Sequence, residues 1–159
     1  MAKVSAGLML WKRGAGGLRV LLVHPGGPFW TKRDLGAWTI PKGEFGADET
    51  PLAAARREFA EELGVLLDAV SAGHILPLGS VRQAGGKTVT GFAAEGDLDA
   101  ETIVSNTVEM EWPPRSGRRR TFPEVDRAAW FSLAEARERI NPAQAAFLDT
   151  LEAAVNDMK

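Results

Sequence analysis

The chain has 159 residues, of which 45% are hydrophobic and 25% charged, with a formal net charge of −2. These ordinary values predict a single soluble globular domain over residues 1–159 and argue against a disordered, fibrous or membrane-bundle protein. The chain has no cysteine and only 2 histidines, which excludes disulfides, thiolate chemistry and multi-histidine metal sites and fits a cytoplasmic protein. The apolar run at residues 6–11 is too short for a signal-peptide core or a membrane span.

The first third of the chain is predicted to consist of strands around a loop. Apolar alternation favours a strand over residues 3–11, and a continuous apolar run favours a buried strand over residues 19–24. The glycine-rich segment at residues 14–17 is predicted to form the turn between them. Glycine and proline make residues 25–36 a loop, and we expect a short strand at residues 38–40 before Pro41.

A helix is predicted over Pro51–Leu63. Thr50 supplies an N-cap hydroxyl, Pro51 suits the first helical position, and Gly64 suits the C-terminal cap. Further strands are expected at residues 74–83, 87–95, 107–112 and 121–131, with a polar loop at 97–106. Ser132 and Glu135 indicate a capping box for a short helix, and a last helix is expected from residue 141. This order of elements predicts an α+β fold, a mixed sheet with helices on its faces.

The helix at residues 51–63 carries acids that packing does not explain. Glu58 and Glu62 repel each other at i,i+4, and they lie in the half of the helix where the dipole disfavours anions. A solvated acidic face would be one interpretation. Carboxylates converging from one helical turn would also suit a hard cation such as Mg²⁺ or Mn²⁺.

The residues upstream favour the metal site. Gly43, Glu49, Arg57, Glu58, Glu61, Glu62 and Gly64 fill every fixed position of the pattern G-x5-E-x7-R-E-U-x-E-E-x-G-U, where U is a bulky apolar residue. This stretch resembles the Nudix box, and the lead-in from Trp38 to Gly43 resembles the W-x-x-P-K-G of the same family. The resemblance implies a Nudix hydrolase, with an α/β/α sandwich around a mixed sheet, that cleaves a nucleoside diphosphate linked to another group.

The resemblance also implies roles for the box residues. Glu58 and Glu62 resemble the principal metal ligands, Glu61 a further ligand or the holder of a metal-bound water, and the Lys42 backbone carbonyl another ligand. Arg57 would pair with Glu49, while Gly43 and Gly64 would serve backbone geometry. Glu58 and Glu61 are both candidates for the general base.

Residues outside the box complete the candidate set. Glu124 lies in a stretch that resembles the one in diadenosine polyphosphate hydrolases where a further Glu reaches the metals, with Asp126, Glu109 and Glu111 as weaker rivals. Phe29 and Trp30 could stack on a nucleobase or anchor their loop, and Lys42 could contact phosphate. Trp38, Trp112 and Trp130 are expected in the core or on a sheet face.

An arginine-rich loop bears on the choice of substrate. Arg115, Arg118, Arg119 and Arg120 could clamp phosphates, grip an RNA 5′ end or form a solvated hairpin tip. The favoured prediction is a metal-dependent pyrophosphohydrolase of dinucleoside polyphosphates or nucleoside triphosphates. The alternatives are an RNA 5′-pyrophosphohydrolase and a non-catalytic nucleotide-sensing domain, although the latter would be expected to lose box glutamates.

Overall fold

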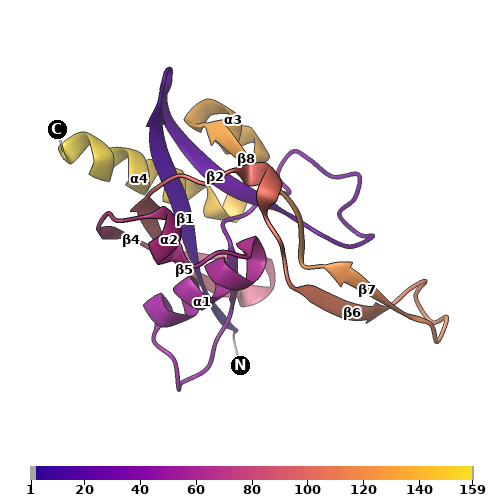
Figure 1. Cartoon of the computed structure of the whole chain (residues 1–159). Helices are drawn as coiled ribbons and strands as arrows, with labels where there is room; N and C mark the ends of the chain where they lie inside the picture. Colours follow the sequence, from indigo (N-terminus) through magenta and orange to yellow (C-terminus); the bar gives the residue numbers. More distant parts are fainter. Residues whose placement is uncertain (1–2, 159) are drawn as a thin grey trace.

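The computed structural model describes residues 3–158 and is built around one mixed sheet (Figure 1). Its strand order is β4-β5-β1-β2-β8, and β3 pairs with β1. β1 runs parallel to β5, and the other pairs are antiparallel, so the predicted mixed sheet is confirmed. The strands are β1 (Val4–Gly14), β2 (Gly17–Pro25), β3 (Lys42–Glu44), β4 (Ile75–Arg82), β5 (Thr88–Glu95) and β8 (Val125–Ser132).

Helices cover both faces of this sheet, and each face has its own apolar core. Along β1, Leu8 and Leu10 pack towards α1 (Pro51–Leu63) and α2 (Leu67–Val70), whereas Met9 and Trp11 pack towards α4 (Ala145–Asp157). The two-residue period of a strand directs alternate side chains into opposite layers. The predicted α+β sandwich is therefore confirmed, with α3 (Leu133–Arg139) on the same side as α4.

The ends of α1 follow from its sequence. The Thr50 hydroxyl accepts a hydrogen bond from the Ala53 N–H at 3.1 Å, and Gly64 ends the helix at φ 76° in the left-handed region. A Cβ on Gly64 would also lie 2.5 Å from the carbonyl oxygen of Val104. The helix that carries the acids is thus fixed at both ends.

The segment ahead of α1 is inserted into the sheet. β1 and β2 pair only near their turn, and residues 38–44 occupy the gap that opens between them. Val23 and Thr39 exchange backbone hydrogen bonds of 2.9 Å, and the Leu8 N–H donates to the Pro41 carbonyl at 3.0 Å. The predicted strand at residues 38–40 is wrong in its limits, because only isolated bridges form there and the regular strand begins at Lys42.

A second correction concerns the predicted strand at residues 121–131, which is two strands in two sheets. β7 (Arg119–Pro123) pairs with β6 (Thr107–Glu111) in a separate hairpin, whereas β8 pairs with β2. Pro123 has no N–H to continue a ladder, and the chain changes sheets at Glu124. The β6–β7 hairpin, here called the arm, projects from the body of the molecule (Figure 1).

The remaining differences are local. The loop at 97–106 contains a 3-10 turn at Ala100–Thr102, and another at Ala84–Gly86 follows β4. The last helix, predicted from residue 141, begins at Ala145 after a 3-10 turn at Pro142–Gln144 that Asn141 caps. The predicted capping box of Ser132 and Glu135 is confirmed. Within residues 3–158, no helix is long and apolar enough to cross a membrane.

Candidate functional site

Three glutamates from two distant segments meet at one edge of the sheet. Glu58 and Glu62 lie one turn apart on α1 and are only 6% and 4% exposed. Glu124 lies between β7 and β8, and one carboxylate oxygen of each residue lies within 4.8 Å of the others. Three carboxylates so close together repel one another unless protons or cations intervene.

Backbone hydrogen bonds bring Glu124 to the helix. The Asn106 N–H donates to the Glu61 carbonyl at 2.8 Å, and the Glu124 N–H donates to the Asn106 carbonyl at 2.9 Å. The Glu124 carbonyl in turn accepts from the Gly26 N–H at 2.9 Å. One relay therefore joins α1, the base of the arm, Glu124 and the loop at residues 26–36.

The electrostatics of the cluster show this repulsion. Burial, followed by the charges of Glu124 and Glu58, raises the pKa of Glu62 to about 9. Burial and the charge of Glu61 also raise the pKa of Glu58, although Arg57 opposes that shift. Without a cation, the site therefore retains a proton at neutral pH.

Arg57 organises the outer side of the cluster. Its Nε and Nη2 form two hydrogen bonds with the Glu49 carboxylate, at 2.8 and 2.9 Å, and its Nη1 donates to Glu58 at 2.9 Å. The same Nη1 lies 3.4 Å from both oxygens of Glu61. The hydrogen bonds from Arg57 lower the pKa of Glu49. Glu61 thus faces Arg57 and lies outside the group formed by Glu58, Glu62 and Glu124.

Gly43 gives the Glu58 carboxylate its space. A Cβ at residue 43 would lie 2.1 Å from Oε1 of Glu58. The carboxylate therefore lies directly against the backbone of β3, which only glycine permits.

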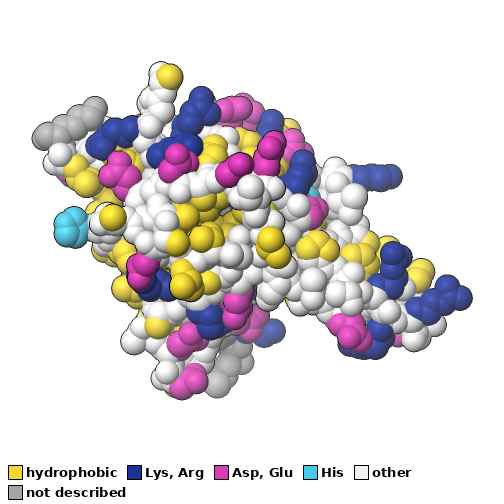
Figure 2. All heavy atoms as spheres, in the orientation of Figure 1, with side chains coloured by type: hydrophobic (Ala, Val, Ile, Leu, Met, Phe, Trp, Pro, Cys, Tyr) yellow, Lys and Arg dark blue, Asp and Glu magenta, His cyan; other side chains and the backbone are white. Residues whose placement is uncertain are grey.

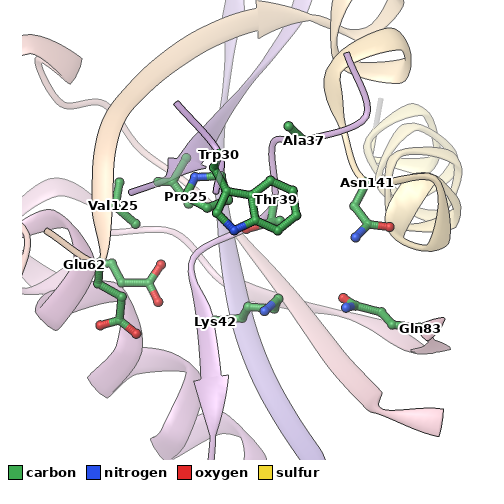
Figure 3. A pocket seen from close by; sticks show the side chains of 11 residues that line it. Pro25, Trp30, Ala37, Thr39, Lys42, Glu62, Gln83, Val125 and Asn141 are labelled. Atoms are coloured by element: carbon green, nitrogen blue, oxygen red, sulfur yellow. The ribbon is translucent and has the colours of Figure 1, made fainter. Parts of the chain in front are cut away.

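A cleft of about 310 Å³ opens beside the carboxylates (Figure 3). Glu62 lies at one end, where Glu124 adjoins it, Gln83 and Asn141 line the other end, and Trp30 and Lys42 lie between them. Burial and the nearby Lys87 lower the pKa of Lys42, while Glu62 opposes that shift. The loop that carries Trp30 thus forms one wall of the cleft, and the start of β3 forms another.

His24, which sequence reasoning left without a role, fixes the Trp30 loop. It is fully buried, with Nδ1 2.8 Å from Oδ1 of Asp126 and Nε2 2.6 Å from the Arg33 carbonyl oxygen. Its ring also meets Trp38 edge-on, with 5.2 Å between centroids. Asp126, a rival for the metal-ligand role, is thus engaged with His24.

The remaining aromatic candidates lie in different surroundings. Phe29 is 59% exposed and packs edge-on against Trp112 of the arm, with 5.2 Å between the ring centroids. This contact joins the loop that carries Trp30 to the arm. Trp38 is buried in the core, as expected, and Trp130 packs partly buried against the α1 side of the sheet. Trp112 lies on the arm rather than in the core.

The arginine cluster lies on the arm and not around the cleft. Arg115 and Arg118 lie in the hairpin loop, whereas Arg119 and Arg120 belong to β7 itself. All four are exposed, and Figure 2 shows the basic side chains gathered at the outer part of the arm. The remaining ligand rivals also lie there, since Glu109 pairs with Arg119 and Glu111 accepts backbone N–H bonds from Arg115 and Gly117. Among the described residues 3–158, none of those that line the cleft belongs to the arm.

Gln83 and Asn141 are cleft residues that sequence reasoning missed. Gln83 directly follows β4, before a glycine turn, and Asn141 lies where the sequence predicts the start of the last helix. Neither carries a local signal, because their common position depends on α4 packing beside β4.

The carboxylate cluster fits a divalent cation on its chemistry. Three oxygen donors converge, two of them from buried side chains, and a cation between them would relieve the mutual repulsion that contributes to the raised pKa of Glu62. Hard cations such as Mg²⁺ and Mn²⁺ prefer this donor set.

Comparison with known proteins identifies the family of the domain and structures with a similar fold. The family model of the NUDIX domain matches residues 1–151. A Caenorhabditis elegans Ap4A hydrolase in a binary complex has a similar structure, with a TM-score of 0.65 and 20% identity over 98% of this chain and 99% of that one. The NUDIX domain of Shewanella oneidensis NrtR, solved with ADP-ribose, has a TM-score of 0.63 and 20% identity, over 100% of this chain and 90% of that one. The C-terminal domain of mouse MUTYH, solved with human PCNA, has a TM-score of 0.59 and 20% identity, over 98% of this chain and 91% of that one. No curated protein matches the sequence significantly.

Proposed function

Since this chain belongs to the Nudix family and is a Nudix-type hydrolase acting on pyrophosphate bonds, we propose that it hydrolyses small nucleotides with the help of Mg²⁺ or Mn²⁺. The favoured substrates are dinucleoside polyphosphates and nucleoside triphosphates. The observation that carries the proposal is the group formed by Glu58, Glu62 and Glu124 at the end of a cleft that also contains Trp30 and Lys42.

In this proposal the metal ions are held by Glu58, Glu62 and Glu124, with the Lys42 carbonyl and Glu61 as further ligands. Divalent ions bound there would supply neutralisation of the pyrophosphate charge and a lowered pKa for water. Lys42 offers its ammonium to a phosphate, and Trp30 offers an aromatic face to a nucleobase.

A proton acceptor for the attacking water is available from the chain itself. Glu58 and Glu61 are the candidates, and they differ in surroundings. Glu58 is buried, and this burial raises the pKa of its carboxyl, while the Glu61 side chain is 40% exposed and faces Arg57. Arg57 contacts both and is proposed to position them, with Glu49 holding Arg57 in turn.

The test is a screen of nucleoside triphosphates, dinucleoside polyphosphates and nucleotide sugars with Mg²⁺ in ¹⁸O-labelled water. The label locates the attacked phosphorus. Turnover that disappears in Glu62→Gln supports the proposal. Nucleotide binding without turnover in the parent would instead support a nucleotide-sensing domain.

A second candidate, hydrolysis at an RNA 5′ end, is favoured by the position of the arginines. Arg115 and Arg118 lie on the arm, outside the cleft, so a substrate that contacts both places must be extended. A polynucleotide has that length, whereas a mononucleotide within the cleft does not. Salt-dependent cleavage of triphosphorylated RNA would support this candidate.

A further inference from the structure

A buried glutamine fixes the orientation of Gln83 in the cleft. Gln144 is fully buried, and its Oε1 accepts the Ile40 backbone N–H at 3.0 Å. A backbone N–H can only donate, so the other end of Gln144 must be its NH₂ group, which donates to Oε1 of Gln83 at 2.8 Å. The oxygen of Gln83 is therefore occupied, and its NH₂ group is free to donate into the cleft.

Asn141 is fixed by the same logic. Its Oδ1 accepts the Ala143 backbone N–H at 3.0 Å, which leaves its NH₂ group as the free end. Neither this NH₂ nor that of Gln83 has a protein acceptor within residues 3–158. Both residues line the cleft at the end away from Glu62 (Figure 3). That end therefore presents two donors whose orientation the fold determines.

The hydroxyl of Thr39 adds an acceptor to this cleft. Its proton is donated to the Ile40 carbonyl at 2.9 Å, so the Thr39 oxygen offers only lone pairs. Trp30 lies between the amide end and the carboxylate end and supplies an aromatic face. With the phosphates at the carboxylates, as the proposed function requires, the amide end faces the nucleoside.

We propose that Gln83 and Asn141 select a 6-keto purine, the base of guanine and hypoxanthine nucleotides, over adenine. This inference rests on the proposed function, because that function determines which end of the cleft holds the base. A 6-keto purine presents two adjacent acceptors, O6 and N7, and an N1–H donor. Adenine has an NH₂ group in place of O6 and no hydrogen on N1. Two fixed NH₂ donors match the first pattern and oppose the second.

The test measures binding of GMP, IMP and AMP by calorimetry in the presence of Mg²⁺. These monophosphates have no pyrophosphate bond, so the measurement does not depend on hydrolysis. We expect GMP and IMP to bind about tenfold or more tightly than AMP, the discrimination typical of a paired donor contact. Gln83→Glu and Asn141→Asp each keep the occupied oxygen and replace only the free NH₂ by an acceptor. Each should reduce the GMP-to-AMP affinity ratio about tenfold or more.

The added negative charge weakens the binding of both GMP and AMP. A change in their affinity ratio therefore reports on recognition of the base and not on charge. Asn156→Asp makes the same chemical change at an exposed position near the end of α4, outside the cleft, and should leave the ratio unchanged. Equal binding of GMP and AMP to the parent, or an unchanged ratio in both cleft variants, would overturn the inference. Loss of inorganic pyrophosphate binding with an unchanged ratio would also overturn it, by showing that the amides hold phosphate.

Hydrolysis of GTP and ATP by the same proteins distinguishes the two proposals. A preference for GMP without any hydrolysis would leave the base selection standing and defeat the proposed function. Hydrolysis of both nucleotides with no preference in binding would do the reverse.

Discussion

Gly43 and Glu58 share one space, since a Cβ on the glycine would lie 2.1 Å from a carboxylate oxygen of the glutamate. Gly43 lies in β3, which is paired with β1 in the sheet, and Glu58 lies on α1, whose two ends are fixed by the caps at Thr50 and Gly64. Neither element can retreat without breaking backbone hydrogen bonds. The glycine of the box thus determines where the glutamate of the box can lie.

Gly43→Ala should therefore displace Glu58 and reduce kcat at least about a hundredfold, the size of effect that a misplaced catalytic group produces. Strain from overpacking should lower the free energy of unfolding by about 1–3 kcal/mol. Gly16→Ala is the matched control, because a Cβ there meets nothing within 4 Å. Kinetics and denaturant titration check both variants, and an active Gly43→Ala enzyme would refute the argument.

Glu62 should make the metal-free protein less stable as the pH rises. Its pKa is raised from 4.5 to about 9 in the folded state, so between those values the folded chain keeps a proton that the unfolded chain has lost. The free energy of unfolding should then fall with pH in this window, by at most about 1.4 kcal/mol per pH unit.

Glu62→Gln cannot ionise, so its stability advantage over the parent should grow from low to high pH. Urea unfolding in a chelating buffer at several pH values measures the difference. Parallel pH profiles for parent and variant would show that Glu62 titrates normally.

Mg²⁺ or Mn²⁺ should raise the melting temperature of the parent, because the ions bind the assembled carboxylates and not the unfolded chain. At a hundredfold excess over Kd the gain is about 2.7 kcal/mol. Glu58→Gln, Glu62→Gln and Glu124→Gln should each reduce the shift, whereas Glu101→Gln, on an exposed turn, should keep it. An equal shift in all variants would place the ions elsewhere.

Arg57→Lys should lower kcat more than KM, because lysine cannot hold Glu49 through two hydrogen bonds while also contacting Glu58. The pH profile of kcat should shift as well, because Glu58 loses the hydrogen bond from Arg57 that opposes the rise of its pKa. Arg56→Lys is a neighbouring control, because Arg56 pairs with the exposed Asp68. Identical pH profiles for parent and Arg57→Lys would reduce Arg57 to a purely structural residue.

The arm arginines should distinguish the substrate classes. Combined Arg115→Ala and Arg118→Ala should leave kcat/KM for GTP and ATP within about threefold of the parent, because neither residue lines the cleft. If the arm binds RNA, cleavage of triphosphorylated RNA should fall and lose part of its salt dependence. A KM for small nucleotides that rises with phosphate number would instead show that the arm folds over the cleft.

The sequence predicted the sheet, both helical layers and the caps of α1 because these depend on local periodicity and on single capping residues. The change of sheet at Glu124 could not be read in the same way. Residues 121–131 are extended throughout, and only the pairing partners, β6 or β2, distinguish the two strands. Pro123 was the one local sign of the break.

For the candidate site, the box spacing predicted which side chains share a face of α1, and helical geometry brings Glu58 beside Glu62. The amide end of the cleft was not predictable. Gln83 follows β4 and Asn141 precedes α4. Gln144 forms hydrogen bonds with both residues, and these bonds can form only when α4 packs on the sheet. Such contacts depend on tertiary packing, which local sequence patterns do not reveal.

The insertion of residues 38–44 between β1 and β2 gives the cleft two unlike sides. Lys42 and Gly43 belong to β3, and Thr39 exchanges two backbone hydrogen bonds with Val23 of β2, so moving these residues requires the breaking of backbone hydrogen bonds. Trp30 lies on a loop held by a few contacts, among them those of His24 and Gly26. Any adjustment to ligands of different size therefore falls to the Trp30 side, and hydrogen exchange should be slow at residues 38–44 and fast at residues 27–36.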